Sequence, residues 1–173
     1  MTYQLKQRLW NGTKAIEITD DEGTTVATVQ RVDVPGNEKR HSFRFDMNGE
    51  HATLGIKRGR LLFATYRLLW GGDEFILKDH PANSILYFCV TGKMHEHPVE
   101  LLETWTKGIE VKFAGRKVAT VETGGAVLRA SIQIEGKSDD SFLPLALAVL
   151  GYFMYKIYSD ESELLEEILG EIL

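Results

Sequence analysis

Residues 142–155 form a segment with no charged side chain and no polar side chain other than tyrosine. A helix that is apolar on every side must lie inside a protein core or inside a lipid bilayer. Asp139, Asp140 and Ser141 precede the segment with oxygens and negative charge suited to a helix N-terminus, and Pro144 falls in the first turn. The sequence therefore predicts a helix over about residues 141–158.

The length of the segment distinguishes these two environments. Fourteen uncharged residues span about 21 Å, whereas a bilayer core of about 30 Å requires about 20 residues. Lys156 is the only basic residue near either end, so the positive flank that orients membrane helices is nearly missing. We favour a buried core helix. The alternative is a tail-anchored membrane protein in which residues 142–158 span the bilayer.

Short segments of alternating apolar and polar residues dominate the chain before this helix, as in antiparallel strands. One example is residues 42–47, which precede Asn48-Gly49, the pair that a type I′ hairpin turn prefers. Twelve strands are expected, at 3–9, 15–19, 24–30, 42–47, 50–57, 60–70, 74–78, 84–90, 99–105, 109–113, 118–121 and 126–134.

Twelve strands predict a closed barrel, because an open sheet of this size leaves exposed edges. Side chains from the wall fill a barrel of about eight strands, whereas a larger barrel leaves a lumen. The predicted fold is therefore mainly β, a closed antiparallel barrel of about twelve strands around the C-terminal helix.

This layout resembles the tubby C-terminal-like superfamily, which includes tubby domains, plant LURP-one-related proteins, phospholipid scramblases and small bacterial proteins. The resemblance covers nearly the whole chain and includes residues 140–150 of the helix. Residues 115–121 are also similar to the family's Gly-Lys-x-Ala-x-Ile run. The size suits a small bacterial-type member.

The resemblance implies a barrel threaded by its own helix, and a binding or scaffold role without catalysis. Tubby domains bind phosphoinositide headgroups through basic residues. Scramblases have a cysteine-rich palmitoylation segment and an acidic calcium-binding stretch before the helix. This chain has one cysteine, and only Asp139-Asp140 stand at that place, so neither scramblase feature carries over.

Residues 159–173 predict a second, acidic amphipathic helix outside the barrel of residues 1–158. Its aliphatic residues share one face at helical spacing, and they are Leu164, Leu165, Ile168, Leu169, Ile172 and Leu173. Packing against the barrel, a protein partner or a homo-oligomer could cover this face. The partner-binding candidates are Leu165, Ile168, Leu169 and Ile172.

Charge is unevenly distributed within the net −5 of the chain. Residues 139–173 hold one Lys and eight acids, whereas residues 31–70 hold eight Lys/Arg and four Asp/Glu. The acidic balance argues against nucleic-acid binding. The positive excess predicts an anion or anionic phospholipid headgroup site, the alternative being an ordinary solvated turn. The candidate residues of this anion site are Lys57, Arg58 and Arg60 at one expected hairpin tip, with Lys39, Arg40 and Arg44 as reinforcing residues.

His95 and His97 form the best metal-like pattern, because side chains two residues apart on a strand project to one side. His80 or Glu100 would be the third ligand. Pro98 favours a solvated loop instead, so we expect no metal and no cofactor. No nucleophile or nucleotide-binding motif occurs, which predicts a protein without catalytic activity. An enzyme whose catalytic residues come from distant strands is the remaining alternative.

Cellular location is expected to be cytoplasmic, at the membrane periphery if a lipid is bound. The N-terminus lacks the apolar run of a signal peptide. The single cysteine, Cys89, lies in the apolar run 85–90, which predicts a buried, unreactive thiol.

Overall fold

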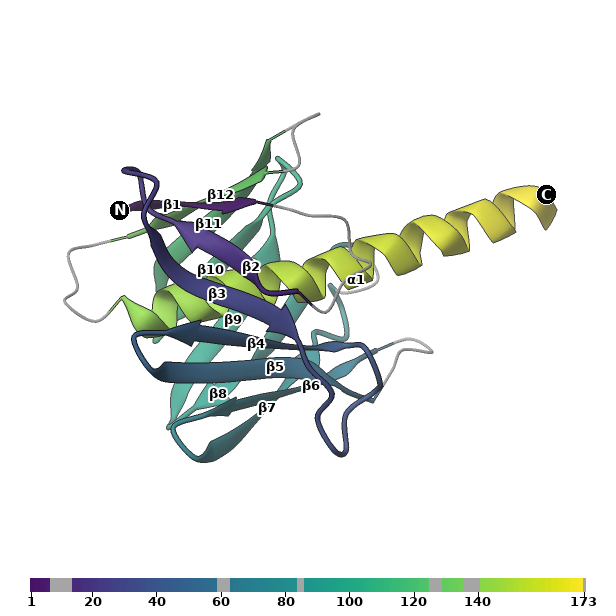
Figure 1. Ribbon diagram of the computed structural model, residues 1–173. Helices are drawn as coiled ribbons and strands as arrows, with labels where there is room; N and C mark the ends of the chain where they lie inside the picture. The colour runs from purple at the N-terminus through teal and green to yellow at the C-terminus, as the bar shows by residue number, and fades with distance from the viewer. Residues whose placement is uncertain (7–13, 59–62, 84–85, 125–128, 136–140, 173) are drawn as a thin grey trace.

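The chain folds into a closed twelve-stranded antiparallel barrel around one long helix (Figure 1). The computed structural model describes all residues except 7–13, 59–62, 84–85, 125–128, 136–140 and 173, and describes only the backbone of 161–172 and of a few strand residues. The elements are β1 (Thr2–Lys6), β2 (Ile16–Thr19), β3 (Thr25–Arg31), β4 (Ser42–Met47), β5 (Glu50–Arg58), β6 (Thr65–Trp70), β7 (Asp73–Asp79), β8 (Cys89–Met94), β9 (His97–Glu103), β10 (Ile109–Phe113), β11 (Arg116–Gly124), β12 (Arg129–Ile134) and α1 (Phe142–Ile172). The predicted fold class is confirmed.

The barrel closes because β1 pairs with both β12 and β2. Tyr3 lies opposite Ile132 of β12, and Leu5 lies opposite Ile18 of β2. Every other strand pairs with its neighbours in sequence. Closure leaves no strand edge on which another chain could form a ladder.

Alternation along each strand places apolar side chains in the barrel interior. On β4, Phe43 and Phe45 are buried and lie opposite Leu54 and Ala52 of β5, which are also buried. The hairpin between them turns at Asn48-Gly49, both at positive φ, as the sequence predicts.

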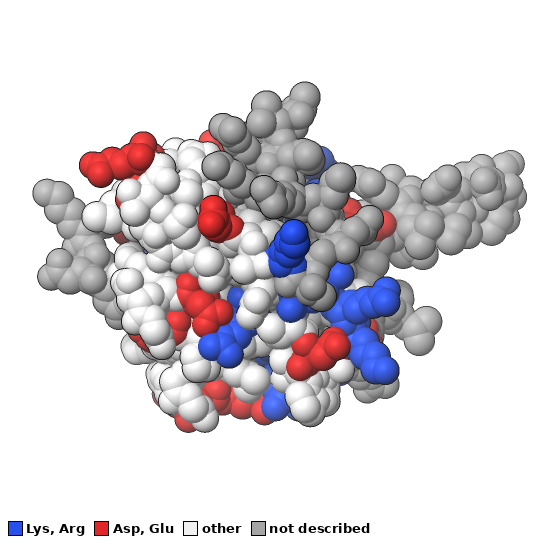
Figure 2. All heavy atoms as spheres, in the orientation of Figure 1, with Lys and Arg blue, Asp and Glu red and all other residues white. Residues whose placement is uncertain are grey.

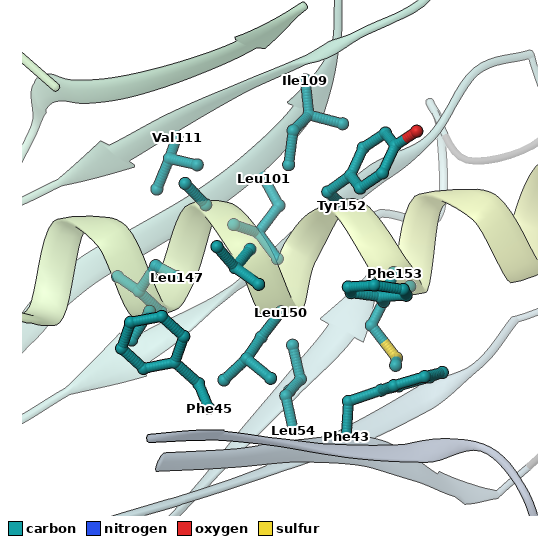
Figure 3. Close-up of a cluster of buried hydrophobic side chains, with 14 of the residues drawn as sticks. Phe43, Phe45, Leu54, Leu101, Ile109, Val111, Leu147, Leu150, Tyr152 and Phe153 are labelled. Carbon is teal, nitrogen blue, oxygen red and sulfur yellow. The ribbon is translucent and has the colours of Figure 1, made fainter. Parts of the chain in front are cut away.

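Helix α1 fills the lumen (Figure 3). Leu147 and Leu150 are fully buried, and Phe153 stacks on Phe43 with ring centroids 4.6 Å apart. Gly151 allows the helix to approach the wall closely, because a Cβ there would contact Leu101 and Ile109 at 3.2 Å. Within the described residues, one stretch, Phe142–Asp160, is long and apolar enough to cross a membrane, and 78% of it is buried inside the barrel. This burial supports the core interpretation.

The two predicted helices form one helix. Residues 142–172 are helical without a break, so the expected boundary near residue 158 lies inside α1. The burial of side chains ends at Tyr158, and Asp160 is exposed. The rest of the helix projects from the barrel (Figure 1).

The strand predicted at 84–90 begins later, as β8 at Cys89. Residues before it form a loop in which the Asn83 carbonyl accepts the N–H groups of Leu86 and Tyr87. These hydrogen bonds curl the apolar run away from β7. The strand continues instead through Gly92, where a Cβ would collide with Leu77 of β7.

We expect Leu150→Asp to abolish cooperative folding, because an unpaired carboxylate inside an apolar barrel costs several kcal/mol against a total stability of about 5–15 kcal/mol. Leu150→Met is the matched control and should cost less than about 1.5 kcal/mol. Thermal unfolding followed by circular dichroism measures both. A Leu150→Asp protein that melts like the parent would show that α1 does not hold the barrel together.

Candidate functional site

The two ends of the barrel differ in the length of their connections. One end, the turn end, contains short turns such as Asn48-Gly49 and Gly71-Gly72. The connections at the other end include four that are described in whole or in large part, and they join β3 to β4, β5 to β6, β7 to β8 and β9 to β10. We call the described residues of these connections the exit rim: 32–41, 63–64, 80–83, 86–88 and 104–108.

Helix α1 enters at the turn end and leaves through the exit rim. Its first residue, Phe142, stacks on Trp70 at the end of β6, with ring centroids 6.3 Å apart. Near the other end of the buried part, Tyr155 and Tyr158 pack edge-on against Phe88 of the exit rim, at 5.7 and 5.5 Å. The exit rim therefore surrounds the point where α1 leaves the barrel.

Exposed apolar side chains gather on the exit rim. Among the described residues, five large hydrophobic side chains are exposed, and four of them belong to the rim. These are Phe63 (38% exposed), Leu86 (81%), Tyr87 (37%) and Trp105 (104%). They lie on three successive connections of the exit end, and we call these four residues the apolar arc. Large exposed hydrophobic side chains at one end of a barrel are candidates for a binding surface.

Asp79 fixes the part of the rim that contains Phe63. Its carboxylate is buried at the end of β7 and accepts the N–H of Ala64 at 2.8 Å and the Tyr66 hydroxyl at 3.0 Å. Both donors flank the start of β6 at Thr65. The predicted strand over 60–70 is therefore shorter, and its first residues belong to the rim connection.

Glu103 links two further connections to the helix. One carboxylate oxygen accepts the Phe88 N–H at 2.9 Å, and the other lies 3.4 Å from the Tyr155 hydroxyl and 3.5 Å from Lys107 Nζ. The Glu103 side chain is 12% exposed. Charge-assisted hydrogen bonds in such a site are stronger than neutral ones. The apolar arc is thus held on a fixed framework.

Charge also separates between the ends. Among the residues whose side chains are described, the connections at the exit end, with strand-terminal residues included, hold five Lys/Arg and four Asp/Glu. The connections at the turn end hold one Lys/Arg and seven Asp/Glu in the described part of the chain. The turn end is therefore the acidic end of the barrel, and the exit end has a small positive excess. Figure 2 shows most of the basic side chains of this face on the side where α1 leaves.

Two of the predicted anion-binding residues lie on the exit rim. Lys39 and Arg40 are exposed, and within the described part of the chain neither side chain forms an ion pair. Arg40 has a left-handed backbone (φ 66°), and its N–H donates to Asp33 at 3.3 Å. This local hydrogen bond supports a conformation that few non-glycine residues adopt.

The structure describes only part of the predicted hairpin tip. Lys57 and Arg58 belong to β5, and the Lys57 ammonium lies 3.4 Å from Glu74 of β7. Arg60 and the Arg58 side chain lie outside the described residues. Lys57 therefore has an acidic neighbour on the barrel wall.

Arg44 does not join the basic group of the exit rim. Its guanidinium contacts Asp46 two residues further along β4, at 2.8 Å. Together with Glu50, His51 and Trp70 it lines a shallow groove near the turn end. Arg44 was predicted to reinforce the tip of Lys57, Arg58 and Arg60, and in the structure an acid on the same strand, Asp46, balances its charge.

The histidine pair does not form a metal-like pattern. His95 lies in the turn between β8 and β9 with φ 44°, and its imidazole is 3.5 Å from Asp73. His97 begins β9 and packs against Phe113, with ring centroids 5.5 Å apart. The turn breaks the two-residue alternation on which the prediction depended.

The residues proposed as a third ligand do not join this pair. Glu100 lies 3.7 Å from Lys112, and His80 follows β7 at the exit end, whereas His95 lies at the turn end. Among the described residues, no three His, Cys, Asp or Glu side chains are grouped closely enough to hold a metal ion.

Cys89 is a buried thiol, 2% exposed, as the sequence predicts. Burial away from solvent raises its pKa above the ordinary value, and the Asn83 amide hydrogen bond opposes this shift. A raised pKa keeps the thiol protonated at neutral pH, whereas a cysteine nucleophile requires the thiolate.

The partner-binding candidates Leu165, Ile168, Leu169 and Ile172 belong to the projecting part of α1. Sequence reasoning missed Phe63, Leu86, Tyr87 and Trp105. The sequence signal was present in the apolar residues between strands, but each was assigned to a strand, where an apolar residue is expected.

A comparison of the chain with protein-family models, curated proteins and solved structures finds no significant match.

We expect Glu103→Ala to lower the free energy of unfolding by about 1–3 kcal/mol, because the Phe88 N–H and the Tyr155 hydroxyl lose their acceptor. Lys107→Ala is the control and should change it by less than about 0.5 kcal/mol, since that side chain is largely exposed. Urea unfolding measures both. Equal effects of the two substitutions would contradict the role given to Glu103.

Proposed function

We propose that the protein is a non-catalytic binding domain of the tubby-like type, and that its exit rim binds an acidic amphipathic helix of a protein partner. The barrel threaded by α1 supports the tubby-like assignment, since this is the layout that the resemblance implies. Fold alone does not determine function. The proposal therefore depends on the chemistry of the rim.

The observation that carries the proposal is the presence of exposed apolar and exposed basic side chains at one end of the barrel. Trp105 and Leu86 are almost fully exposed, and Lys39 and Arg40 lie at the same end, on the connection next to the one that holds Phe63. Aromatic residues and arginine are enriched at protein interfaces. A ligand that matches both features needs an apolar face beside negative charges.

The projecting part of α1 favours a protein partner over a flat anionic membrane. Residues 161–172, which we call the tail, extend about 18 Å at 1.5 Å per residue. The tail contains five glutamates and no basic residue. A flat anionic surface that approached the rim would meet this acidic helix first. A partner that lies beside the helix can reach the rim.

The positions of the cysteine and of two histidines support a non-catalytic role. Cys89 is buried with a raised pKa, and the imidazoles of His95 and His97 contact different groups on different strands. General acid–base or nucleophilic catalysis needs such groups to converge on one position.

The test uses a synthetic helix of about 15 residues with leucines on one face and glutamates on the other, and a matched peptide with lysines in place of the glutamates. The acidic peptide should bind and the lysine peptide should not. Trp105→Ala should weaken binding about tenfold or more, and Lys39→Ala/Arg40→Ala about three- to tenfold. Fluorescence anisotropy of the labelled peptides measures these affinities.

Arg116→Ala at the turn end is the matched control and should leave peptide affinity unchanged. Phosphatidylserine vesicles provide the second arm, since an anionic headgroup is the other ligand that a basic rim could take. No binding of the acidic peptide would overturn the proposal. Vesicle binding that disappears in Lys57→Ala/Arg58→Ala/Arg60→Ala, without peptide binding, would assign the basic residues to a lipid instead.

A further inference from the structure

The tail of α1 has the properties of the ligand that the exit rim is proposed to bind. It is helical, it contains five glutamates without a basic residue, and its sequence places Leu164, Leu165, Ile168 and Leu169 on one face. The exit end has the exposed basic residues Lys39 and Arg40 and an exposed apolar arc. Both surfaces belong to the same chain.

The tail cannot reach the rim of its own barrel. Helix α1 is continuous from Phe142 to Ile172, without a turn that could fold the tail back. Figure 1 shows the tail leading away from the strands. Only another molecule can bring an equivalent tail beside this rim.

We propose that two copies of the chain form a dimer in which the two exit rims face each other and each tail lies against the rim of its partner. The inference rests on the proposed function of the rim and names its partner. The two tails run antiparallel with their apolar faces together, while the flanking glutamates approach the basic residues of the facing rim. The same surface is used on both copies, as in a two-fold symmetric interface.

Charge selects this arrangement over a chain of molecules joined head to tail. A head-to-tail contact would place the acidic tail against the turn end, where the described residues hold seven Asp/Glu and one Lys/Arg. Like charges brought together at an interface suppress the wrong pairing. Facing rims keep the tail away from these acids, place its glutamates near the exposed Lys39 and Arg40, and close the assembly at two copies.

Burial of apolar side chains supplies the attraction between the two copies, and charge selects their orientation. Trp105 and Leu86 are the most exposed large hydrophobic side chains of the rim, at 104% and 81%. A tail that lies beside them would remove them from water together with its own leucines. Residues of this type at the centre of an interface contribute most of its affinity.

Analytical ultracentrifugation of the full chain across a concentration series tests the dimer. We expect a reversible monomer–dimer equilibrium that weakens as salt rises, because part of the attraction is between charges. Leu165→Asp/Leu169→Asp should give a monomer with an unchanged melting temperature, since the tail lies outside the barrel. Arg116→Glu at the turn end should leave the equilibrium unchanged.

A charge exchange tests the pairing of tail with rim. Lys39→Glu/Arg40→Glu and, separately, Glu166→Lys/Glu167→Lys should each weaken the dimer at least about tenfold, because symmetry counts each change twice. The chain that combines all four changes should regain most of the lost affinity. A stabilising effect unrelated to pairing would not produce this recovery.

A chain that stays monomeric at every concentration up to about 1 mM would overturn the dimer. A dimer that both double variants leave unchanged would overturn the proposed arrangement. Either result leaves the function of the rim to be decided by the synthetic peptide, because that experiment measures binding without reference to self-association.

Discussion

The lumen of a twelve-stranded barrel is the constraint on which the rest of this structure depends. Side chains from the wall cannot fill so wide a barrel, and an empty apolar cavity would be costly. Helix α1 resolves this problem, with Leu147 and Leu150 in the centre and Phe153 stacked on Phe43. Since the helix must enter at one end and leave at the other, the two ends of the barrel become different. Short turns join the strands at the end where the helix enters, and longer connections surround the helix where it leaves.

The sequence predicted the parts of the fold that depend on local pattern. An uncharged run marked the central helix, and alternation with turn residues marked twelve strands, because both signals arise from neighbouring residues. The predictions that failed depended on tertiary contacts. Hydrogen bonds to Asn83 curled the apolar run before Cys89 into a loop. The strand expected over 60–70 begins only at Thr65, next to the two groups that donate hydrogen bonds to Asp79.

The candidate site was only partly predictable for a related reason. Lys39 and Arg40 were identified from a local excess of charge, yet the concentration of acids at the turn end appears only when the described connections are sorted by end. That sorting requires strand direction and therefore the topology. Arg44 shows the same limit, because it is close to Arg40 in sequence but runs along β4 to pair with Asp46. The distribution of charge between the two ends therefore depends on the topology of the whole barrel.

The order of elements along the chain also affects how the barrel can form. The helix that fills the lumen follows all twelve strands, and the closing ladder joins β1 to β12, with Met1 and Ile134 in contact across 133 residues. Contacts between residues so distant in sequence make folding slow. During synthesis, the strands emerge before the helix that must cover their apolar faces. A nascent chain would therefore expose the apolar inner face of its strands until the helix that follows them left the ribosome, which makes chaperone protection valuable at that stage.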